Sequence, residues 1–244
     1  MAPGGCLTTL RVGARTSPLS RWQAERIRSL LQAAGHPTEF VGVTTTGDLD
    51  RATPLGRFGQ PAIFSRELDE ALTAGRIDLA VHSLKDLPTT MPDGVRLAAV
   101  SGREDARDAL VGHGPLRWAE IPPGATIATS SLRRQAQLRR ARPDLTVVDL
   151  RGNVGTRITT LDRMPEWTGI LLATAGLLRL GLQGRIGERL PLELMLPAPG
   201  QGALAVTTRA DDPATARRAR AAVNDAATEF AVSAERALLA TVEG

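Results

Sequence analysis

The only lysine of the chain lies in a polar run whose residue types suit acid–base chemistry on an anionic ligand. Lys85 is the single lysine among 30 lysine and arginine residues, and Asp86 follows it in His82-Ser83-Leu84-Lys85-Asp86. A compact ammonium neutralises a carboxylate, and a neighbouring carboxyl group can exchange a proton or stabilise a nearby cation. An ordinary Lys–Asp pair in a turn is the alternative. The run predicts a candidate acid/base at Asp86 beside a cationic group.

Three further runs place arginines and hydroxyl groups where helices are expected to begin. They are Arg15-Thr16-Ser17-Pro18, Thr129-Ser130-Ser131-Leu132-Arg133-Arg134 and Arg151-Gly152-Asn153-Val154-Gly155-Thr156-Arg157. Helix N-termini attract anions, and the guanidinium fork suits carboxylates. The same helix dipole disfavours arginine in a first turn, so Arg133 and Arg134 predict a strong anion nearby. The alternatives are ordinary helix caps, a solvated basic helix and a glycine-rich connector with exposed charge.

Short apolar segments precede these polar runs and alternate with helical patterns. Strands are expected at 7–13, 39–43, 77–81, 126–129, 146–150 and 169–173, and helices at 18–34, 65–74, 132–141, 154–163, 177–180 and 224–242. This alternation predicts an α/β protein with mostly parallel sheets and helices on both faces. Ligands of such sheets bind beyond the carboxyl ends of the strands, where the polar runs fall. Linkers are expected near 100–107 and 196–202, and the four runs are expected to line one cleft between two α/β domains.

Composition excludes several function classes. The net charge of +4, the 3% aromatic content and the absence of tyrosine argue against a nucleic-acid-binding surface. No apolar stretch is long enough for a transmembrane helix, and the N-terminus lacks the pattern of a signal peptide. The single cysteine excludes an internal disulfide framework, and no His/Cys cluster has metal-ligand spacing. We therefore expect a cytoplasmic protein with neither a membrane nor a nucleic-acid partner and no metal.

In order and spacing, the motifs resemble those of the porphobilinogen deaminase family. The matching runs are 15–19, 46–48, 81–88, 103–108, 129–134, 150–157, 175–177 and 197–203. The likeness extends from about Leu10 to Gly244. The resemblance implies stepwise condensation of four porphobilinogen molecules to hydroxymethylbilane, with ammonia released each time. It also implies two periplasmic-binding-protein-like (type II) domains, a small third domain and a dipyrromethane cofactor held covalently by a cysteine of that third domain.

The resemblance also assigns roles to individual residues. Asp86 matches the catalytic acid/base, and Asp48 matches part of a mobile cover. The positions that match the binding of substrate and cofactor carboxylates are Arg15, Ser17, Lys85, Ser131, Arg133, Arg134, Arg151, Asn153, Arg157 and Arg179. The expected partners are therefore porphobilinogen and polypyrrole intermediates, handled by a monomer.

The sequence departs from the family pattern in two places. It ends at Glu243-Gly244, where the family continues into its Gly-Gly-Cys loop, and its only cysteine, Cys6, lies before the first expected strand. The loop 57–64 lacks the usual glycine-rich form. We expect domain 1 at 1–101 and 201–220, domain 2 at 102–200 and a remnant of domain 3 at 221–244. The hypothesis that follows is that this polypeptide alone has little sustained activity.

A non-catalytic, two-domain receptor for polycarboxylates is the main alternative function. Such a receptor gains little from an acid in its binding site, so exchanging Asp86 for asparagine separates the two functions. A nucleic-acid-binding protein is the more distant alternative, and a steep salt dependence of oligonucleotide binding would identify it.

Overall fold

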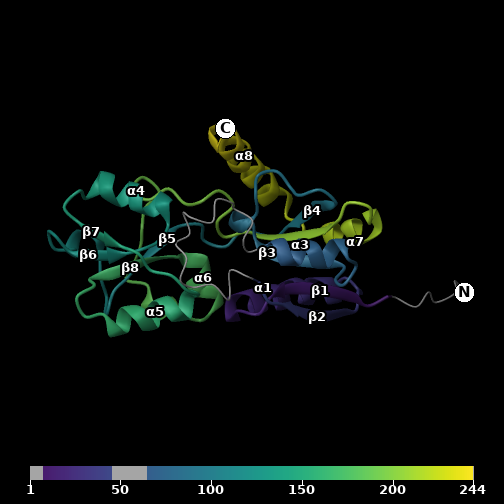
Figure 1. Cartoon of the computed structure of the whole chain (residues 1–244), viewed down its shortest axis with the longest axis horizontal. Helices are drawn as coiled ribbons and strands as arrows, with labels where there is room; N and C mark the ends of the chain where they lie inside the picture. Colours follow the sequence, from purple (N-terminus) through teal and green to yellow (C-terminus); the bar gives the residue numbers. More distant parts are fainter. Residues whose placement is uncertain (1–7, 46–64, 244) are drawn as a thin grey trace, which may run out of the picture. The chain divides into compact units, whose positions relative to one another are not determined.

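The computed structural model describes residues 8–45 and 65–243. Its elements are β1 (Leu10–Arg15), α1 (Pro18–Ala33), β2 (Thr38–Val43), α3 (Arg66–Thr73), β3 (Leu79–Ser83), η3 (Leu84–Asp86), β4 (Val95–Val100), β5 (Asp108–Val111), η4 (Trp118–Glu120), β6 (Thr126–Ala128), α4 (Leu132–Ala141), β7 (Thr146–Val148), α5 (Val154–Arg163), β8 (Gly169–Ala173), α6 (Thr174–Arg179), η5 (Gln183–Arg185), β9 (Glu188–Arg189), β10 (Leu204–Arg209), α7 (Pro213–Val223) and α8 (Ala226–Glu243). They form two compact units (Figure 1), unit 1 from 8–45, 65–103 and 203–243 and unit 2 from 104–202.

Unit 1 is built on a five-stranded sheet in the order β2-β1-β3-β10-β4. The pairs β2–β1 and β1–β3 are parallel, whereas β10 runs antiparallel to both β3 and β4. The chain supplies β10 only after it has built unit 2, so this strand enters the sheet from the opposite end. The predicted α/β class is confirmed, and the sheet is mixed where mostly parallel pairing was expected.

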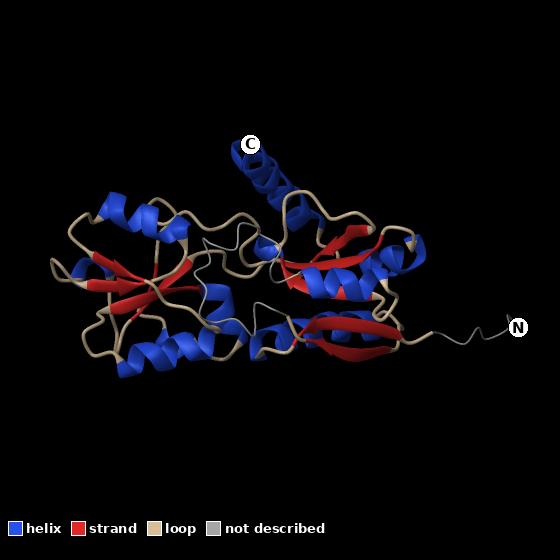
Figure 2. Cartoon of the chain, in the orientation of Figure 1, coloured by secondary structure: helices blue, strands red, loops and turns tan. Residues whose placement is uncertain are grey.

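Helices cover both faces of this sheet (Figure 2). Helix α1 begins where Ser17 caps it and Pro18 occupies its first turn, and it buries Ala24, Ile27 and Leu31. These side chains join one core cluster with the α7 residues Ala216, Ala219 and Val223. Helix α3 packs on the other face, where Leu68 and Leu72 join Ile77, Ala80 and Val95.

Unit 2 repeats the plan with a sheet in the order β7-β6-β8-β5-β9. Strands β6, β7 and β8 are parallel, and β5 runs antiparallel to β8 and β9. Alternate residues of each strand face opposite sides: Leu110 and Leu171 join the cluster with Leu138 of α4, whereas their neighbours join the cluster that contains Leu161 of α5.

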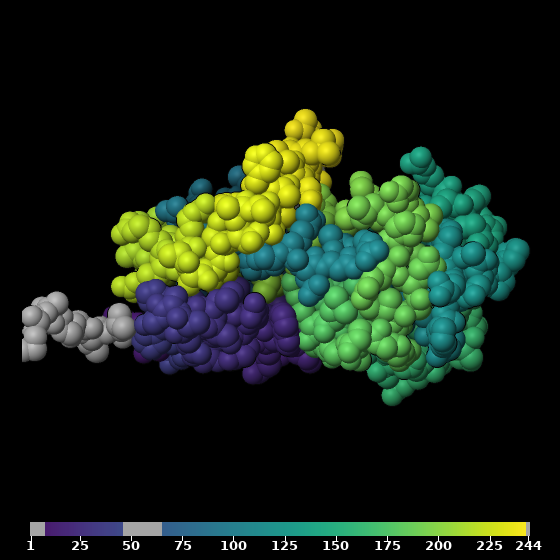
Figure 3. All heavy atoms as spheres, turned by 180° about the vertical axis from the view of Figure 1, so that it is seen from behind, coloured from purple at the N-terminus to yellow at the C-terminus, as the bar shows by residue number. Residues whose placement is uncertain are grey.

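Helix α8 ends the described chain and belongs to unit 1. Val232 is buried in a cluster with Leu84 and Leu87, whereas Phe230, Leu238 and Val242 are exposed. The far end of the helix extends beyond the rest of unit 1 (Figure 3). Among the described residues, no helix has both the length and the apolar character that a membrane crossing requires.

Candidate active site

The predicted residues of unit 1 gather at one edge of its sheet. Arg15 is the last residue of β1, and Lys85 and Asp86 follow the end of β3 in the short helix η3. Because β1 and β3 are parallel neighbours, their carboxyl ends meet at the same edge. Arg15 lies close enough to His82, near the end of β3, to add to the effect of burial, which lowers the pKa of His82 to about 4.

Two buried leucines fix the turn that carries Asp86. Leu84 and Leu87 are buried on either side of Lys85 and Asp86, which are both half-buried. The Leu84 N–H donates to the Ala203 carbonyl at 3.0 Å, and the Leu87 N–H donates to the Leu84 carbonyl at 3.1 Å. Asp86 itself makes no hydrogen bond or ion pair with any residue that the structure describes. Its carboxylate is therefore held in place by the backbone and open to a ligand.

Side chains from α1 and β10 support this edge. Ser17 caps α1 by accepting from the Ser20 N–H at 3.3 Å, so part of its hydrogen-bonding capacity serves the helix. Gln23 donates through Nε2 to Ser83 Oγ at 2.9 Å, which ties the helix to the end of β3. His82 Nε2 lies 3.1 Å from Thr207 Oγ1 in the interior. His82 thus belongs to the interior of the sheet, not to the ligand-facing edge.

The parallel strands of unit 2 end at an edge of the same kind. Ser130 Oγ donates to the Leu150 carbonyl at 2.9 Å and accepts from the Leu150 N–H at 3.0 Å, which joins the loops after β6 and β7. Gln135 donates to the Thr129 carbonyl at 2.8 Å and to Asp149 Oδ1 at 3.1 Å. Ser131 then caps α4 by accepting from the Arg134 N–H. These hydrogen bonds therefore tie the two loops to each other and to the start of α4.

The anion expected beside Arg133 and Arg134 is supplied by the chain itself. Asp108 is fully buried at the start of β5, and its carboxylate lies 2.7 Å from Nη2 of each arginine. Arg134 also donates to the Leu171 carbonyl at 3.0 Å, and Gln201 donates to Asp108 Oδ1 at 2.8 Å. Burial alone would raise the pKa of Asp108, but the charges and hydrogen bonds of its arginine partners hold it at about 2.

The two arginines of this ion-pair cluster differ in how much of their side chains is exposed. Arg134 is only 4% exposed, so its guanidinium supports the fold rather than presenting a surface to a substrate. Arg133 keeps 24% of its side chain exposed and also donates to the Leu196 carbonyl. That both arginines bind a ligand stays a prediction, and of the two Arg133 has the larger exposed surface.

The remaining predicted cations of unit 2 follow β7 and β8. Arg157 Nε donates to the Gly152 carbonyl at 2.7 Å, and Asn153 caps α5 by accepting from the Thr156 N–H at 2.9 Å. Gly152 has a φ of +107°, and a Cβ there would lie 2.8 Å from Thr156 Cγ2, so only glycine fits. Arg151 and Arg157 are half-buried on either side of this tight approach.

Arg179 ends α6, the helix that follows β8. Its Nη2 donates to the Gly202 carbonyl at 2.5 Å. Burial lowers the pKa of Arg179 to about 10, against the opposing effect of Glu104. A cation removed this far from water gains from an added carboxylate, which suits it to anion binding.

Comparison with known proteins identifies the family. Residues 10–217 match the family described as "Porphobilinogen deaminase, dipyromethane cofactor binding domain". The porphobilinogen deaminase of Rubrobacter xylanophilus is 50% identical over 235 residues, which cover 96% of this chain and 76% of that protein. The chain belongs to the porphobilinogen deaminase family. The resemblance inferred from the motifs is thereby confirmed.

Solved structures with little sequence similarity share the fold of this deaminase family member. A methionine-binding protein, MetQ, matches with a TM-score of 0.58 at 14% identity, covering 93% of this chain and 96% of MetQ. A periplasmic substrate-binding protein of an ABC transporter from Coxiella burnetii matches with a TM-score of 0.53 at 16% identity, covering 93% of this chain and 96% of that protein. The periplasmic-binding-protein-like (type II) fold expected from the family is therefore present.

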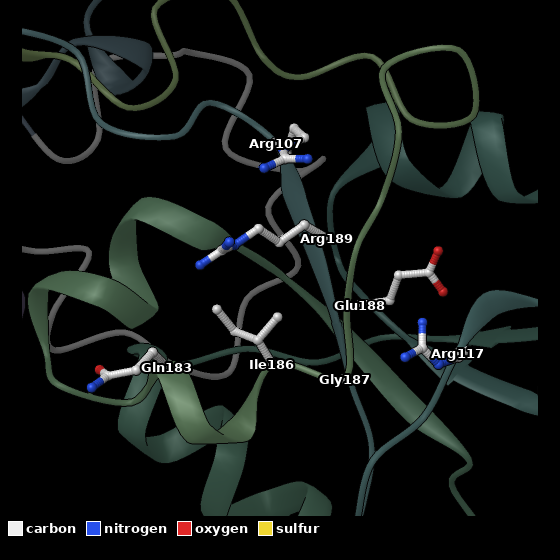
Figure 4. Close-up of a pocket in the computed structure, with 7 residues that line it drawn as sticks. All are labelled: Arg107, Arg117, Gln183, Ile186, Gly187, Glu188 and Arg189. Carbon is white, nitrogen blue, oxygen red and sulfur yellow. The ribbon is translucent and has the colours of Figure 1, made fainter.

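Unit 2 has an open cavity of about 420 Å³ (Figure 4). It is lined by Arg107, Arg117, Gln183, Ile186, Gly187, Glu188 and Arg189, none of which was a predicted site residue of the deaminase motifs. Asp105 already pairs with Arg107 at 2.7 Å and lies 3.5 Å from Arg189. Arg107 belongs to the run 103–108, so this cavity touches one of the family's motifs.

Some predictions fall on other parts of the chain, and some residues escaped prediction. Asp48, Cys6 and the loop 57–64 lie outside the described residues. The described residues contain no group of three His, Cys, Asp or Glu side chains placed to hold a metal ion. Sequence reasoning did not identify the role of Asp108, although it lies in the deaminase motif 103–108. It also missed Arg236, which donates to backbone carbonyls beyond Asp86.

Proposed function

We propose that this chain carries out the condensation of porphobilinogen units to hydroxymethylbilane, with Asp86 as the catalytic acid/base. The observation that carries the proposal is the state of Asp86. It is half-buried at a strand end, fixed by its neighbours and without a partner among the described residues. A structural carboxylate at such an edge is normally paired, as Asp108 is. Membership of the deaminase family supports the same role.

In this mechanism Asp86 donates one proton and takes one back for each porphobilinogen that is added. The protonated carboxyl group gives its proton to the amino group as the C–N bond breaks and ammonia leaves. The carboxylate then stabilises the positive charge of the methylene-pyrrole that remains. After the new C–C bond forms, the carboxylate takes the proton lost from the α-carbon of the acceptor pyrrole. Each cycle returns Asp86 to its protonated form.

Cations at the two strand edges would bind the acetate and propionate groups of the ligands. We assign this role to Arg15, Lys85, Arg133, Arg151, Arg157 and Arg179, with the hydroxyl groups of Ser17 and Ser131 beside them. Asn153 and Arg134 support the site by capping α5 and by pairing with Asp108. The N-termini of α4 and α5 add favourable dipoles. The binding partners would be porphobilinogen and the polypyrroles built from it.

The same donor set fits a dipyrromethane cofactor. The guanidinium groups of Arg157, beside the close backbone approach at Gly152, and of Arg179, which is removed from water, suit a ligand with several carboxylates. When bound, the group would supply the pyrrole α-carbon to which the first porphobilinogen adds. The only cysteine of the 244 residues is Cys6. We therefore propose that these 244 residues bind dipyrromethane by charge alone.

A receptor without catalysis is the second candidate, favoured by the fold shared with a methionine-binding protein. The two functions separate at Asp86. In the assay, free dipyrromethane and porphobilinogen are supplied, and the first addition is followed as tripyrrole by mass spectrometry. Asp86→Asn should slow this addition by about 10²- to 10⁴-fold while dipyrromethane binding stays within about twofold. Asp93→Asn, an exposed aspartate of the same segment, is the matched control.

Two outcomes would contradict the catalytic proposal. One is an Asp86→Asn variant that forms tripyrrole at the original rate. The other is an unaltered protein that binds dipyrromethane but forms no tripyrrole, which would favour the receptor. Intact-mass measurement of the purified polypeptide tests the cofactor statement separately, since a covalent dipyrromethane adduct would refute binding by charge alone.

A further inference from the structure

Helix α8 faces the Asp86 turn with two side chains one helical turn apart. Val232 is 1% exposed and packs in the cluster that contains Leu84 and Leu87, the two leucines on either side of Asp86. Arg236 follows four residues later, on the same face of the helix. The helix therefore contacts the turn with an apolar side chain and, beyond it, with a guanidinium group.

Arg236 binds three consecutive backbone carbonyl groups that follow the Asp86 turn. It donates to the carbonyls of Leu87 at 3.3 Å, Pro88 at 2.6 Å and Thr89 at 3.1 Å. Pro88 has no N–H group, so this stretch cannot be fixed by a regular backbone ladder. A planar guanidinium with several donors in fixed directions can hold consecutive carbonyls in one geometry.

The helix that delivers Arg236 is itself anchored to the sheet of unit 1. The Asp225 N–H donates to the Val100 carbonyl at 2.8 Å just before α8 begins. Glu235, the residue before Arg236, accepts from both terminal nitrogens of Arg103 at 2.5 and 3.0 Å. Arg236 therefore reaches the turn from a fixed support.

We propose that Arg236 is a positioning residue for Asp86. Leu84 and the Ala203 carbonyl fix the entry to the turn, and Arg236 fixes its exit. Lys85 and Asp86 lie between these two points. Without the guanidinium, residues 87–89 can shift. The Asp86 carboxyl group is then no longer aligned with the substrate atoms with which it exchanges its proton. The catalytic part of this inference rests on the proposed function of Asp86.

The test uses Arg236→Ala and Arg236→Lys in the 244-residue polypeptide. Hydrogen exchange of the Leu87 amide, which donates to the Leu84 carbonyl, should become at least about tenfold faster in Arg236→Ala, because local opening is no longer opposed. The first addition of porphobilinogen to supplied dipyrromethane should slow by about 10- to 100-fold, with dipyrromethane affinity within about threefold. Arg236→Lys keeps the positive charge but loses the planar guanidinium group. It should give smaller changes in both the hydrogen exchange and the rate of the first addition.

Arg220→Ala is the matched control, since Arg220 also pairs with α8, through Glu229 at 2.7 Å, but away from the turn. It should change neither the exchange of the Leu87 amide nor the rate of the first addition. Unchanged exchange and rate in Arg236→Ala would overturn the inference, as would equal effects from Arg220→Ala. Should Arg236→Ala fail to fold, Arg236→Lys and Arg236→Gln give the same comparison. Full activity of Asp86→Asn, by contrast, would overturn the proposed function and leave the exchange result on Arg236 standing.

Discussion

Each unit places an aspartate at the edge where its parallel strands end, and the two aspartates are in opposite states. Asp86 in unit 1 is half-buried and has no partner among the described residues. Asp108 in unit 2 is fully buried and holds two arginines and a glutamine. At the corresponding edges of two similar sheets, the same side chain is thus without a described partner in one and part of the core in the other.

The difference shows that surroundings, not residue type, decide what a carboxylate does. A buried ion pair is stable only while both partners are present, because either charge alone is strongly disfavoured in the interior. An aspartate in that state cannot exchange protons near neutral pH. Asp86 has no such partners among the described residues.

The largest effect on stability is expected from Asp108→Asn. This change leaves the buried Arg134 without its counter-charge and should cost about 3–5 kcal/mol. Asp86→Asn, the matched change in unit 1, should cost no more than about 0.5 kcal/mol. Urea unfolding measures both. In a Trp22→Phe background the remaining tryptophans, Trp118 and Trp167, lie in unit 2 and report on it alone by fluorescence.

A double variant checks the cause of the Asp108 effect. Adding Arg134→Met to Asp108→Asn removes the unpaired charge as well, so part of the lost stability should return. If Asp86→Asn destabilised its unit as strongly as Asp108→Asn does, the contrast between the two aspartates would be wrong.

The second effect concerns pH and unit 1. Burial lowers the pKa of His82 to about 4, from an ordinary 6.5. The neutral form is favoured in the folded state, so this stability is full above pH 6.5 and is lost as the pH falls through 4. The loss should reach roughly 3 kcal/mol. Urea unfolding at several pH values, followed through Trp22 in a Trp118→Phe, Trp167→Phe background, measures it.

His82→Gln is the control for this window, since a glutamine nitrogen can still reach Thr207 Oγ1. Burial raises the pKa of Asp69 to about 6, and its protonation on acidification favours folding, against the effect of His82. Both proteins retain Asp69, so the difference between their stability curves isolates His82. Parallel curves between pH 6.5 and 4 would show that His82 does not carry the effect.

Local signals predicted much of the fold. Helices α4 and α5 match their expected bounds, and α1 starts at Pro18 as expected, because caps, prolines and apolar spacing act over a few residues. Strand β10 was missed because its Thr207 and Thr208 are polar in sequence yet fully buried. Their burial depends on β3 and β4 lying on either side, and that arrangement is set by distant parts of the chain.

In the candidate site, too, local features were predictable from the sequence, and contacts between distant residues were not. The polar runs after β1, β3, β6 and β7 were predictable, since each follows an apolar strand directly. The pairing of Asp108 with Arg134 was not, because 26 positions separate them and the sequence gives no sign that the expected anion is internal. The contact of Arg236 with Pro88 spans 148 positions. The common cleft for both edges, and the roles of the residues at them, stay predictions.

The smallest of the three effects lies in unit 2 at a lower pH. The ion pairs hold the pKa of Asp108 at about 2, below the ordinary 3.8, so this stability is complete above pH 3.8 and is lost as the pH falls through 2. The loss should approach about 2 kcal/mol in the Trp22→Phe background and be absent when Asp108→Asn is added. Because unit 1 loses its His82 contribution at higher pH, acid should weaken the two units in succession. A unit 2 whose urea midpoint stays constant from pH 5 to about pH 2 would mean that Asp108 is not the ionised partner of Arg133 and Arg134.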